Sequence, residues 1–204
     1  MIPIVMVYNN KRKELVQQTF RTLDKTVDIG KAKGFIGEDK EGDFKAKSLN
    51  YLKVKNDLIK CIDVDWEFMV VCDDDLYFSK GWLELMEKAM HNNPNVWVLA
   101  ATTWPTHKHL EVRKDITISD MAPGGCCMIR REAWDLCGPY PIDKRKTYIF
   151  VDRVHELGGK VAFLNDQTKV VHCGIKSLID KKGRSPKSIE NLQALADYVG
   201  AKTL

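Results

Sequence analysis

Three consecutive carboxylates, Asp73, Asp74 and Asp75, follow an apolar run that begins at Phe68. Apolar residues resume directly after them, at Leu76. Neighbouring like charges raise one another's pKa values and destabilise the fold, so three carboxylates at the end of a buried strand require a counter-charge. A divalent cation would supply it, and oxygen ligands favour Mg²⁺ or Mn²⁺. A solvated acidic turn is the alternative interpretation, but the apolar residues on both sides argue against it.

Strand-like and helix-like segments alternate around this acidic turn. Runs of β-branched and aliphatic residues predict strands at residues 2–8, 66–72, 96–101, 160–164 and 168–171, and another after Gly125. Apolar residues at helical spacing predict helices at residues 13–24, 48–61, 82–89, 147–157 and 188–199, and another from Arg131. Residues 27–44 predict a loop or an irregular strand, and residues 102–120 predict a loop. The alternation indicates an α/β protein whose mostly parallel central sheet is flanked by helices. The acidic turn would then lie at a strand's carboxyl end, where such sheets bind ligands.

Length and composition fit a single soluble domain. The chain has 204 residues, of which 44% are hydrophobic and 29% charged, and no apolar run approaches the roughly 18–20 residues of a membrane span. The net charge of +4 allows anionic partners such as nucleotides or nucleic acid without requiring them. The six cysteines form no C-x-x-C pair and the amino terminus has no signal-peptide pattern, so we expect reduced thiols and a cytoplasmic protein.

Four segments, in order along the chain, resemble the nucleotide-sugar glycosyltransferases of the GT-A fold, particularly the family 2 type. The apolar strand that ends in the three carboxylates and continues into Phe78-Ser-Lys-Gly-Trp82 is similar to the family's Asp-x-Asp segment. Residues 4–10 resemble its first strand and nucleotide-contacting turn, and residues 124–134 its Gly-x-x-x-hydrophobic-Arg-Arg-Glu-Ala segment. Residues 159–172 resemble its closing strand pair and metal-binding histidine.

The resemblance implies a single Rossmann-like GT-A core over residues 1–175, with a basic linker and a C-terminal helix packed on it over residues 176–204. It implies an enzyme that uses Mn²⁺ or Mg²⁺ to transfer a hexose or pentose from a nucleotide-diphosphate donor, most simply a UDP-sugar, to an acceptor hydroxyl. The acceptor stays open between a glycan and a hydroxylated nucleic-acid base. A nucleotidyltransferase and a non-catalytic nucleotide-sugar-binding module are the alternatives, although the first strand's turn lacks the glycine expected of a nucleotidyltransferase.

By this resemblance, Asp75 binds the metal directly, and Asp73 contacts the ribose or the metal and its water shell. His172 would complete metal or diphosphate binding, although a histidine at a strand end, taken alone, is more often structural. Strand alternation puts Asp73 and Asp75 on one side and Asp74 on the other unless the turn redirects it. We include Asp74 among the residues expected to contact the donor.

The turn after the first strand would hold the base and ribose through Tyr8, Asn9 and Asn10, with Lys11 or Arg12 near the phosphates. These are roles that the resemblance implies. A solvated helix start explains Lys11 and Arg12 equally well.

Asn56 lies inside a predicted helix, where asparagine is mildly unfavourable, so a contact with the donor is one explanation and a solvent-facing side chain the commoner one. Gly124 and Gly125 would let the backbone approach the donor sugar or the acceptor closely. Arg130 and Arg131 flank a strand, and we expect at least one of them to be a surface charge.

An inverting transfer needs a base that deprotonates the acceptor hydroxyl. The family's Glu-Asp pair lies shortly before the glycine of the closing strands, where this chain has Lys146-Thr-Tyr-Ile149 and no carboxylate. Asp152 is the nearest acidic residue and is the base that we expect. Asp120 and Asp143 are the alternatives, and inversion itself depends on one of these carboxylates reaching the acceptor.

Overall fold

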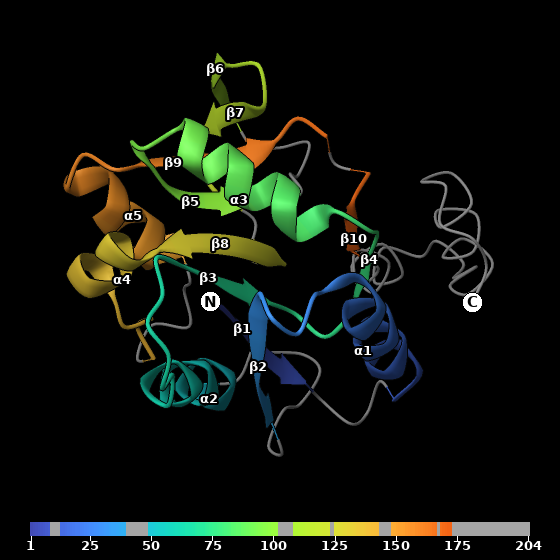
Figure 1. Ribbon diagram of the computed structural model, residues 1–204. Coiled ribbons are helices and arrows are strands. Elements are labelled where there is room, and N and C mark those ends of the chain that lie inside the picture. The colour runs from blue at the N-terminus through green and yellow to red at the C-terminus, as the bar shows by residue number, and fades with distance from the viewer. Residues whose placement is uncertain are drawn as a thin grey trace, which may run out of the picture.

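The computed structural model describes residues 1–8, 13–39, 49–101, 108–122, 125–142, 148–166 and 168–172. They form a layered α/β domain around a central sheet (Figure 1). The helices are α1 (Lys13–Thr26), α2 (Leu49–Lys60), α3 (Trp82–Asn92), α4 (Arg131–Cys137) and α5 (Tyr148–Glu156). The strands are β1 (Ile2–Tyr8), β2 (Ala32–Glu38), β3 (Phe68–Cys72), β4 (Leu76–Phe78), β5 (Val96–Ala100), β6 (His109–Val112), β7 (Ile116–Ser119), β8 (Cys126–Arg130), β9 (Lys160–Leu164) and β10 (Val170–His172).

The central sheet contains eight strands in the order β2-β1-β3-β8-β5-β9-β7-β6. The β1–β2, β1–β3 and β5–β9 pairs are parallel, whereas β8 is antiparallel to β3 and β5, and β7 is antiparallel to β9 and β6. Six of these eight strands therefore run in one direction, and only β8 and β7 of this sheet oppose them. The predicted α/β class with a mostly parallel sheet is confirmed.

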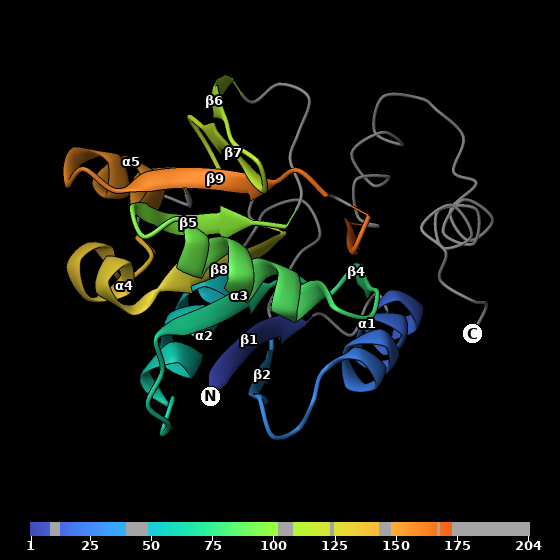
Figure 2. The same cartoon turned by 45° about the horizontal axis from the view of Figure 1, so that its top comes forward.

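Each face of the sheet buries its own apolar cluster, because successive side chains of a strand point to opposite faces. Met6 of β1 packs in the cluster that includes Trp82 and Met86 of α3. Its neighbour Val5 packs in the other cluster, which includes Leu52 of α2 and residues of α4 and α5. Figure 2 shows α3 lying across the near side of the sheet, beside β5. The alternation places α2 and α5 together on the face opposite α3.

Strands form in a segment predicted as a loop or an irregular strand and in another predicted as a loop. Residues 32–38 form β2, and every residue of β1 has a partner in it, so continuous pairing outweighs the weak strand pattern that its glycines produce. The predicted loop at residues 102–120 contains the β6–β7 hairpin. All four residues of β6 are exposed, while all four residues of β7 are buried, so neither strand shows the alternation on which the prediction depended.

Two threonines of α1 hold the chain that follows the three carboxylates. The hydroxyl of Thr19 accepts a hydrogen bond from the backbone N–H of Leu76 at 3.0 Å and lies 2.9 Å from the carbonyl oxygen of Asp74. The hydroxyl of Thr22 accepts a hydrogen bond from the N–H of Phe78 at 3.3 Å. Both threonines are buried. Helix α1 therefore positions the acidic turn and β4 through specific hydrogen bonds as well as through apolar packing.

The short strands β4 and β10 form a separate antiparallel pair. Residues 173–204, which contain the predicted helix at 188–199 and the whole of the second predicted unit at 176–204, lie outside the described residues. None of the described helices combines the length and the hydropathy needed to cross a bilayer.

Candidate functional site

The carboxyl ends of three neighbouring parallel strands meet beside the acidic turn. Met6 of β1 is paired with Cys72, the last residue of β3, so Asp73 follows at the same edge of the sheet as Tyr8, the last residue of β1. Asp39 follows β2 at this edge, and its backbone N–H donates to the carbonyl oxygen of Tyr8 at 2.9 Å. Open α/β sheets bind ligands at such an edge.

Asp73 is held by two side chains of α2. Its Oδ1 accepts hydrogen bonds from the hydroxyl of Tyr51 and from Nζ of Lys55, the latter at 3.2 Å. Nζ of Lys55 also lies 4.5 Å from the centroid of the Tyr51 ring, in a cation–π contact. The side chains of Lys55 and Asp73 are only 5% and 13% exposed, so this ion pair is largely buried. Lys55 therefore supplies part of the counter-charge that the three carboxylates require.

Sequence reasoning missed Tyr51, Lys55 and Asp39. Tyr51 and Lys55 are four residues apart in a predicted helix, which places a phenol and an amine on one helix face, and this spacing was the available signal. Asp39 is 6% exposed and follows β2 directly. An acidic residue after a strand would have marked it as a candidate, but residues 27–44 were predicted as a loop or an irregular strand.

Asp74 and Asp75 are both buried, each with 4% exposure. Leu76, which follows Asp75, is paired with His172 in the β4–β10 ladder, so the backbone of His172 lies beside the acidic turn. The sequence predicts His172 just after the last strand, whereas it is the last residue of β10. The direction of its side chain lies outside what the structure describes.

Carboxylate oxygens and one imidazole are donor types that suit Mn²⁺ or Mg²⁺. The side chain of His172 is not among those that the structure describes. Among the described side chains, no three His, Cys, Asp or Glu residues are arranged around a common metal position. Asp75 is buried and precedes Leu76, whose backbone is paired with that of His172.

Gly125 lies beside the acidic turn. Its carbonyl oxygen accepts a hydrogen bond from the N–H of Asp73 at 2.8 Å, which extends the β3–β8 pairing by one residue. The ring of Tyr8 contacts Phe20 of α1 edge-on, with 5.9 Å between centroids. Other predicted residues of the donor site fall outside the described part of the chain: Asn9, Asn10, Lys11, Arg12 and Gly124.

Asn56 has a structural role. Its Nδ2 donates to the carbonyl oxygen of Tyr140 at 2.9 Å, and its Oδ1 accepts from the N–H of Tyr140 at 3.0 Å. Both bonds are buried, and they fasten α2 to the segment between α4 and α5. Since both polar atoms of the amide are used, we do not retain Asn56 as a residue that contacts the donor.

Two of the three candidate bases lie at or beside α5. Asp152 is exposed on that helix. Asp120 accepts a hydrogen bond at Oδ1 from the N–H of Lys108 at 3.0 Å, and its carbonyl oxygen lies 3.1 Å from Nε2 of His155 on α5. Asp143, the third candidate, lies outside the described residues.

Arg130 and Arg131 serve the fold. The guanidinium of Arg130 donates to the carbonyl oxygen of Met90 at 2.9 Å and lies over the ring of Phe68. Arg131 is paired with Asp135 four residues later at the protein surface. The expectation that at least one of the two is a surface charge is confirmed by Arg131.

The pKa of Tyr51 lies well above its ordinary value of 10, first because the phenol is buried and then because Asp73, Asp74 and Asp75 repel a phenolate. In the unfolded chain this phenol ionises near pH 10, whereas in the folded chain it keeps its proton. Its contribution to stability is therefore complete below pH 10 and is lost as the pH rises further.

Replacing Tyr51 by phenylalanine should make the unfolding free energy less steeply dependent on alkaline pH. The slope above pH 10 should become shallower by up to about 1.4 kcal/mol per pH unit, the value for one proton. Urea unfolding of both proteins from pH 8 to pH 11 measures it. Identical slopes would show that Tyr51 ionises as freely in the folded chain as in the unfolded one.

Neither a protein-family model nor a curated protein matches the sequence. Solved structures match its fold. GalNAc-T7, crystallised with UDP, GalNAc and Mn²⁺, superposes with a TM-score of 0.59 at 8% identity over 80% of this chain and 42% of that one. Residues 1–349 of Staphylococcus aureus TarS superpose with a TM-score of 0.56 at 13% identity over 81% of this chain and 58% of that one.

The mannosyltransferase PcManGT from Pyrobaculum calidifontis, solved with GDP-Man and Mn²⁺, superposes with a TM-score of 0.53 at 12% identity, over 98% of this chain and 70% of that one. The chain spans about half the length of the solved GalNAc-T7 chain and of TarS residues 1–349. At these identities the likeness is one of fold. These neighbours are GT-A glycosyltransferases. The chain therefore has the GT-A fold, with its three carboxylates at the carboxyl edge of the sheet.

Proposed function

We propose that the chain is a metal-dependent glycosyltransferase that moves a sugar from a UDP-sugar to an acceptor hydroxyl. The observation that carries this proposal is the acidic turn at the end of β3, held in place from α1 and α2 within a GT-A fold. The UDP, GDP-Man and Mn²⁺ in the neighbouring structures support a nucleotide-diphosphate donor and a divalent metal.

Asp75 and His172 are the proposed metal ligands. When bound, a divalent cation stabilises the negative charge that develops on the departing nucleotide diphosphate. Oδ1 of Asp73 is already occupied by Tyr51 and Lys55, so we assign Asp73 to the donor's ribose rather than to the metal.

The base and ribose half of the donor would lie over the carboxyl ends of β1 and β2. Tyr8, Asn9, Asn10 and Arg12 remain proposed contacts there, and the buried Asp39 is added to them because it closes the same edge. Asp74 and the Gly124–Gly125 turn remain proposed contacts of the sugar moiety of the donor.

Asp152 remains the proposed base of an inverting transfer, with Asp120 as the alternative. Their exposure leaves both carboxylates accessible to an acceptor, which is either a glycan or a hydroxylated nucleic-acid base. Each of the two carboxylates can be replaced by asparagine in turn. The base is the one whose replacement abolishes transfer while UDP binding is fully retained. A cytoplasmic location remains a prediction from the sequence.

Calorimetry with UDP and UDP-sugars, in Mn²⁺ and in EDTA, tests the proposal. We expect UDP to bind when Mn²⁺ is present and to lose that affinity in EDTA, and we expect slow hydrolysis of the preferred UDP-sugar. Binding without hydrolysis or transfer would favour the non-catalytic module, and release of pyrophosphate from a nucleoside triphosphate would favour the nucleotidyltransferase. Absence of binding by any nucleotide would overturn the proposal.

A further inference from the structure

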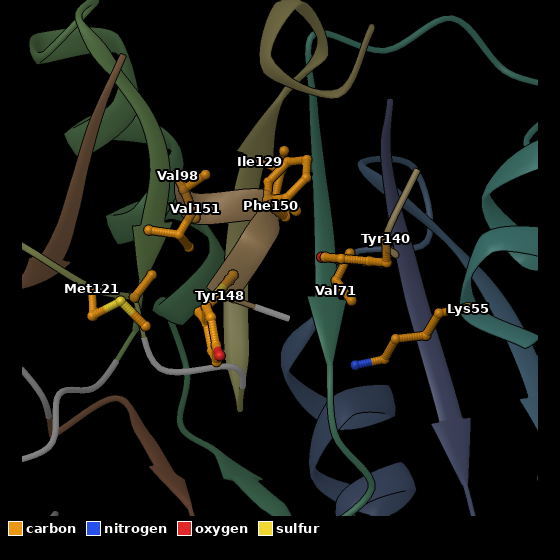
Figure 3. Close-up of a pocket in the computed structure, with 11 residues that line it drawn as sticks. Lys55, Val71, Val98, Met121, Ile129, Tyr140, Tyr148, Phe150 and Val151 are labelled. Carbon is orange, nitrogen blue, oxygen red and sulfur yellow. The ribbon is translucent and has the colours of Figure 1, made fainter. Parts of the chain in front are cut away.

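A small apolar pocket of about 50 Å³ lies between the sheet and α5 (Figure 3). Its described lining comprises Lys55, Val71, Val98, Met121, Ala122, Cys127, Ile129, Tyr140, Tyr148, Phe150 and Val151. Among these residues Lys55 alone carries a charge. Figure 3 shows Ile129 and Phe150 crowded at one end, while the Lys55 amine and the Tyr148 hydroxyl lie toward the end at which β3 finishes.

The pocket adjoins the acidic turn at Lys55. Lys55 belongs to both, because its Nζ is 3.2 Å from Oδ1 of Asp73 while its chain lines the pocket. The lining strands are β3, β8 and β5, which follow one another in the sheet on the side away from β1 and β2. A donor whose base lies over β1 and β2 and whose diphosphate lies at Asp75 would therefore carry its sugar toward this pocket.

The aliphatic part of the lining selects against hydroxyl groups. A hydroxyl placed among Val71, Val98, Ile129 and Val151 would leave water without gaining hydrogen bonds, which costs free energy. A methyl group gains free energy on the same transfer. A water molecule needs about 10–15 Å³, so the volume suits a substituent of a few heavy atoms.

Lys55 adds a hydrogen-bond requirement at the wall of the pocket. An ammonium has three N–H donors and no acceptor, and one of them is directed to Asp73. The matching substituent therefore carries a carbonyl oxygen as well as a methyl group. We propose that the pocket receives the acetamido group of the transferred sugar, so that the donor is a UDP-N-acetylhexosamine. This inference rests on the proposed function and specifies its substrate.

Calorimetry in Mn²⁺ with UDP, UDP-GlcNAc, UDP-GalNAc and UDP-Glc tests the inference on the unaltered chain. Both N-acetyl sugars should bind roughly 10- to 200-fold more tightly than UDP-Glc, the discrimination that an apolar pocket achieves for a small apolar substituent. Equal affinities for UDP-GlcNAc and UDP-Glc, alongside metal-dependent binding of UDP, would overturn the inference and leave the proposed function intact. Failure of UDP itself to bind would overturn both.

Ala122→Leu provides the matched variant. Ala122 is half-buried at the pocket, so a larger side chain fills the space without a deep core substitution. We expect the preference for the N-acetyl sugars to disappear while UDP alone binds as before. Ala122→Gly, which keeps the pocket open, should retain the preference. A preference that survives Ala122→Leu in a folded protein would place the acetamido group elsewhere.

Discussion

Replacing Asp75 by asparagine is expected to remove metal-dependent binding of UDP. Asp75 is buried at the end of the acidic turn, and the next residue is paired with His172. Mutating partners that merely orient metal ligands costs about 10- to 100-fold in metal affinity, so loss of a ligand should cost on the order of 100-fold or more. Calorimetric titration of UDP in Mn²⁺ measures the effect directly.

Two comparisons make the Asp75→Asn result specific. Asp63→Asn removes an exposed carboxylate that is paired with Lys33 far from the acidic turn, and it should bind UDP as the unaltered chain does. His172→Ala should weaken binding less than Asp75→Asn, because one carboxylate ligand remains. If Asp75→Asn is folded by circular dichroism and binds UDP with unchanged affinity in Mn²⁺, Asp75 is not the metal ligand.

The sequence predicts the acidic turn well because two local signals agree there. An apolar run long enough for a buried strand ends at Cys72, and the three carboxylates follow at once. Strands that alternate with helices imply a parallel sheet, and a parallel sheet implies a ligand edge. Local pattern and topology therefore place these residues without knowledge of any partner distant in the sequence.

The contacts that hold the turn could not be predicted in this way, because their partners are far apart along the chain. Lys55 and Asp73 are separated by 18 residues, Thr19 and Leu76 by 57, and Asn56 and Tyr140 by 84. In each case the sequence shows a polar residue on an apolar helix face without showing what it meets. Asn56 illustrates the consequence, since the unfavourable mid-helix asparagine fastens a backbone segment.

Strand β6 shows a different limit. It lies at the edge of the sheet and exposes all four of its residues, including Leu110 and Val112, so no side of it is selected for burial. Period-two alternation arises only where one face of a strand is buried and the other is not. Edge strands of this kind are defined by hydrogen bonding to a neighbour, which only the assembled sheet reveals.

Lys55→Met is expected to destabilise the folded chain by about 3–5 kcal/mol, the cost of removing one partner from a buried ion pair. Asp73 would keep its hydrogen bond from Tyr51 but would lose its ion pair with Lys55. Asp74 and Asp75 follow directly, so the charge of Asp73 also faces like charges. Urea unfolding at pH 7 gives the free-energy difference.

The same helix offers the matched control. Lys60 is 73% exposed and paired with Asp57, itself 54% exposed, and such surface pairs contribute about 0–1 kcal/mol. Lys60→Met should therefore change stability by less than about 0.5 kcal/mol, as surface substitutions usually do. A Lys55→Met variant no less stable than Lys60→Met would show that Lys55 is not the counter-charge of Asp73.

A double-mutant cycle separates the ion pair from the packing of the lysine chain. Asp73→Asn keeps an oxygen that can accept the hydrogen bond from Tyr51 while it removes the charge that Lys55 neutralises. In that background position 73 carries no charge for Lys55 to neutralise. The loss of stability caused by Lys55→Met should therefore be smaller by about 1–3 kcal/mol, the range for directly coupled residues. A cost that is the same in both backgrounds would assign the effect to the aliphatic stem of Lys55, and the acidic turn would then owe its stability to α1 and to the metal.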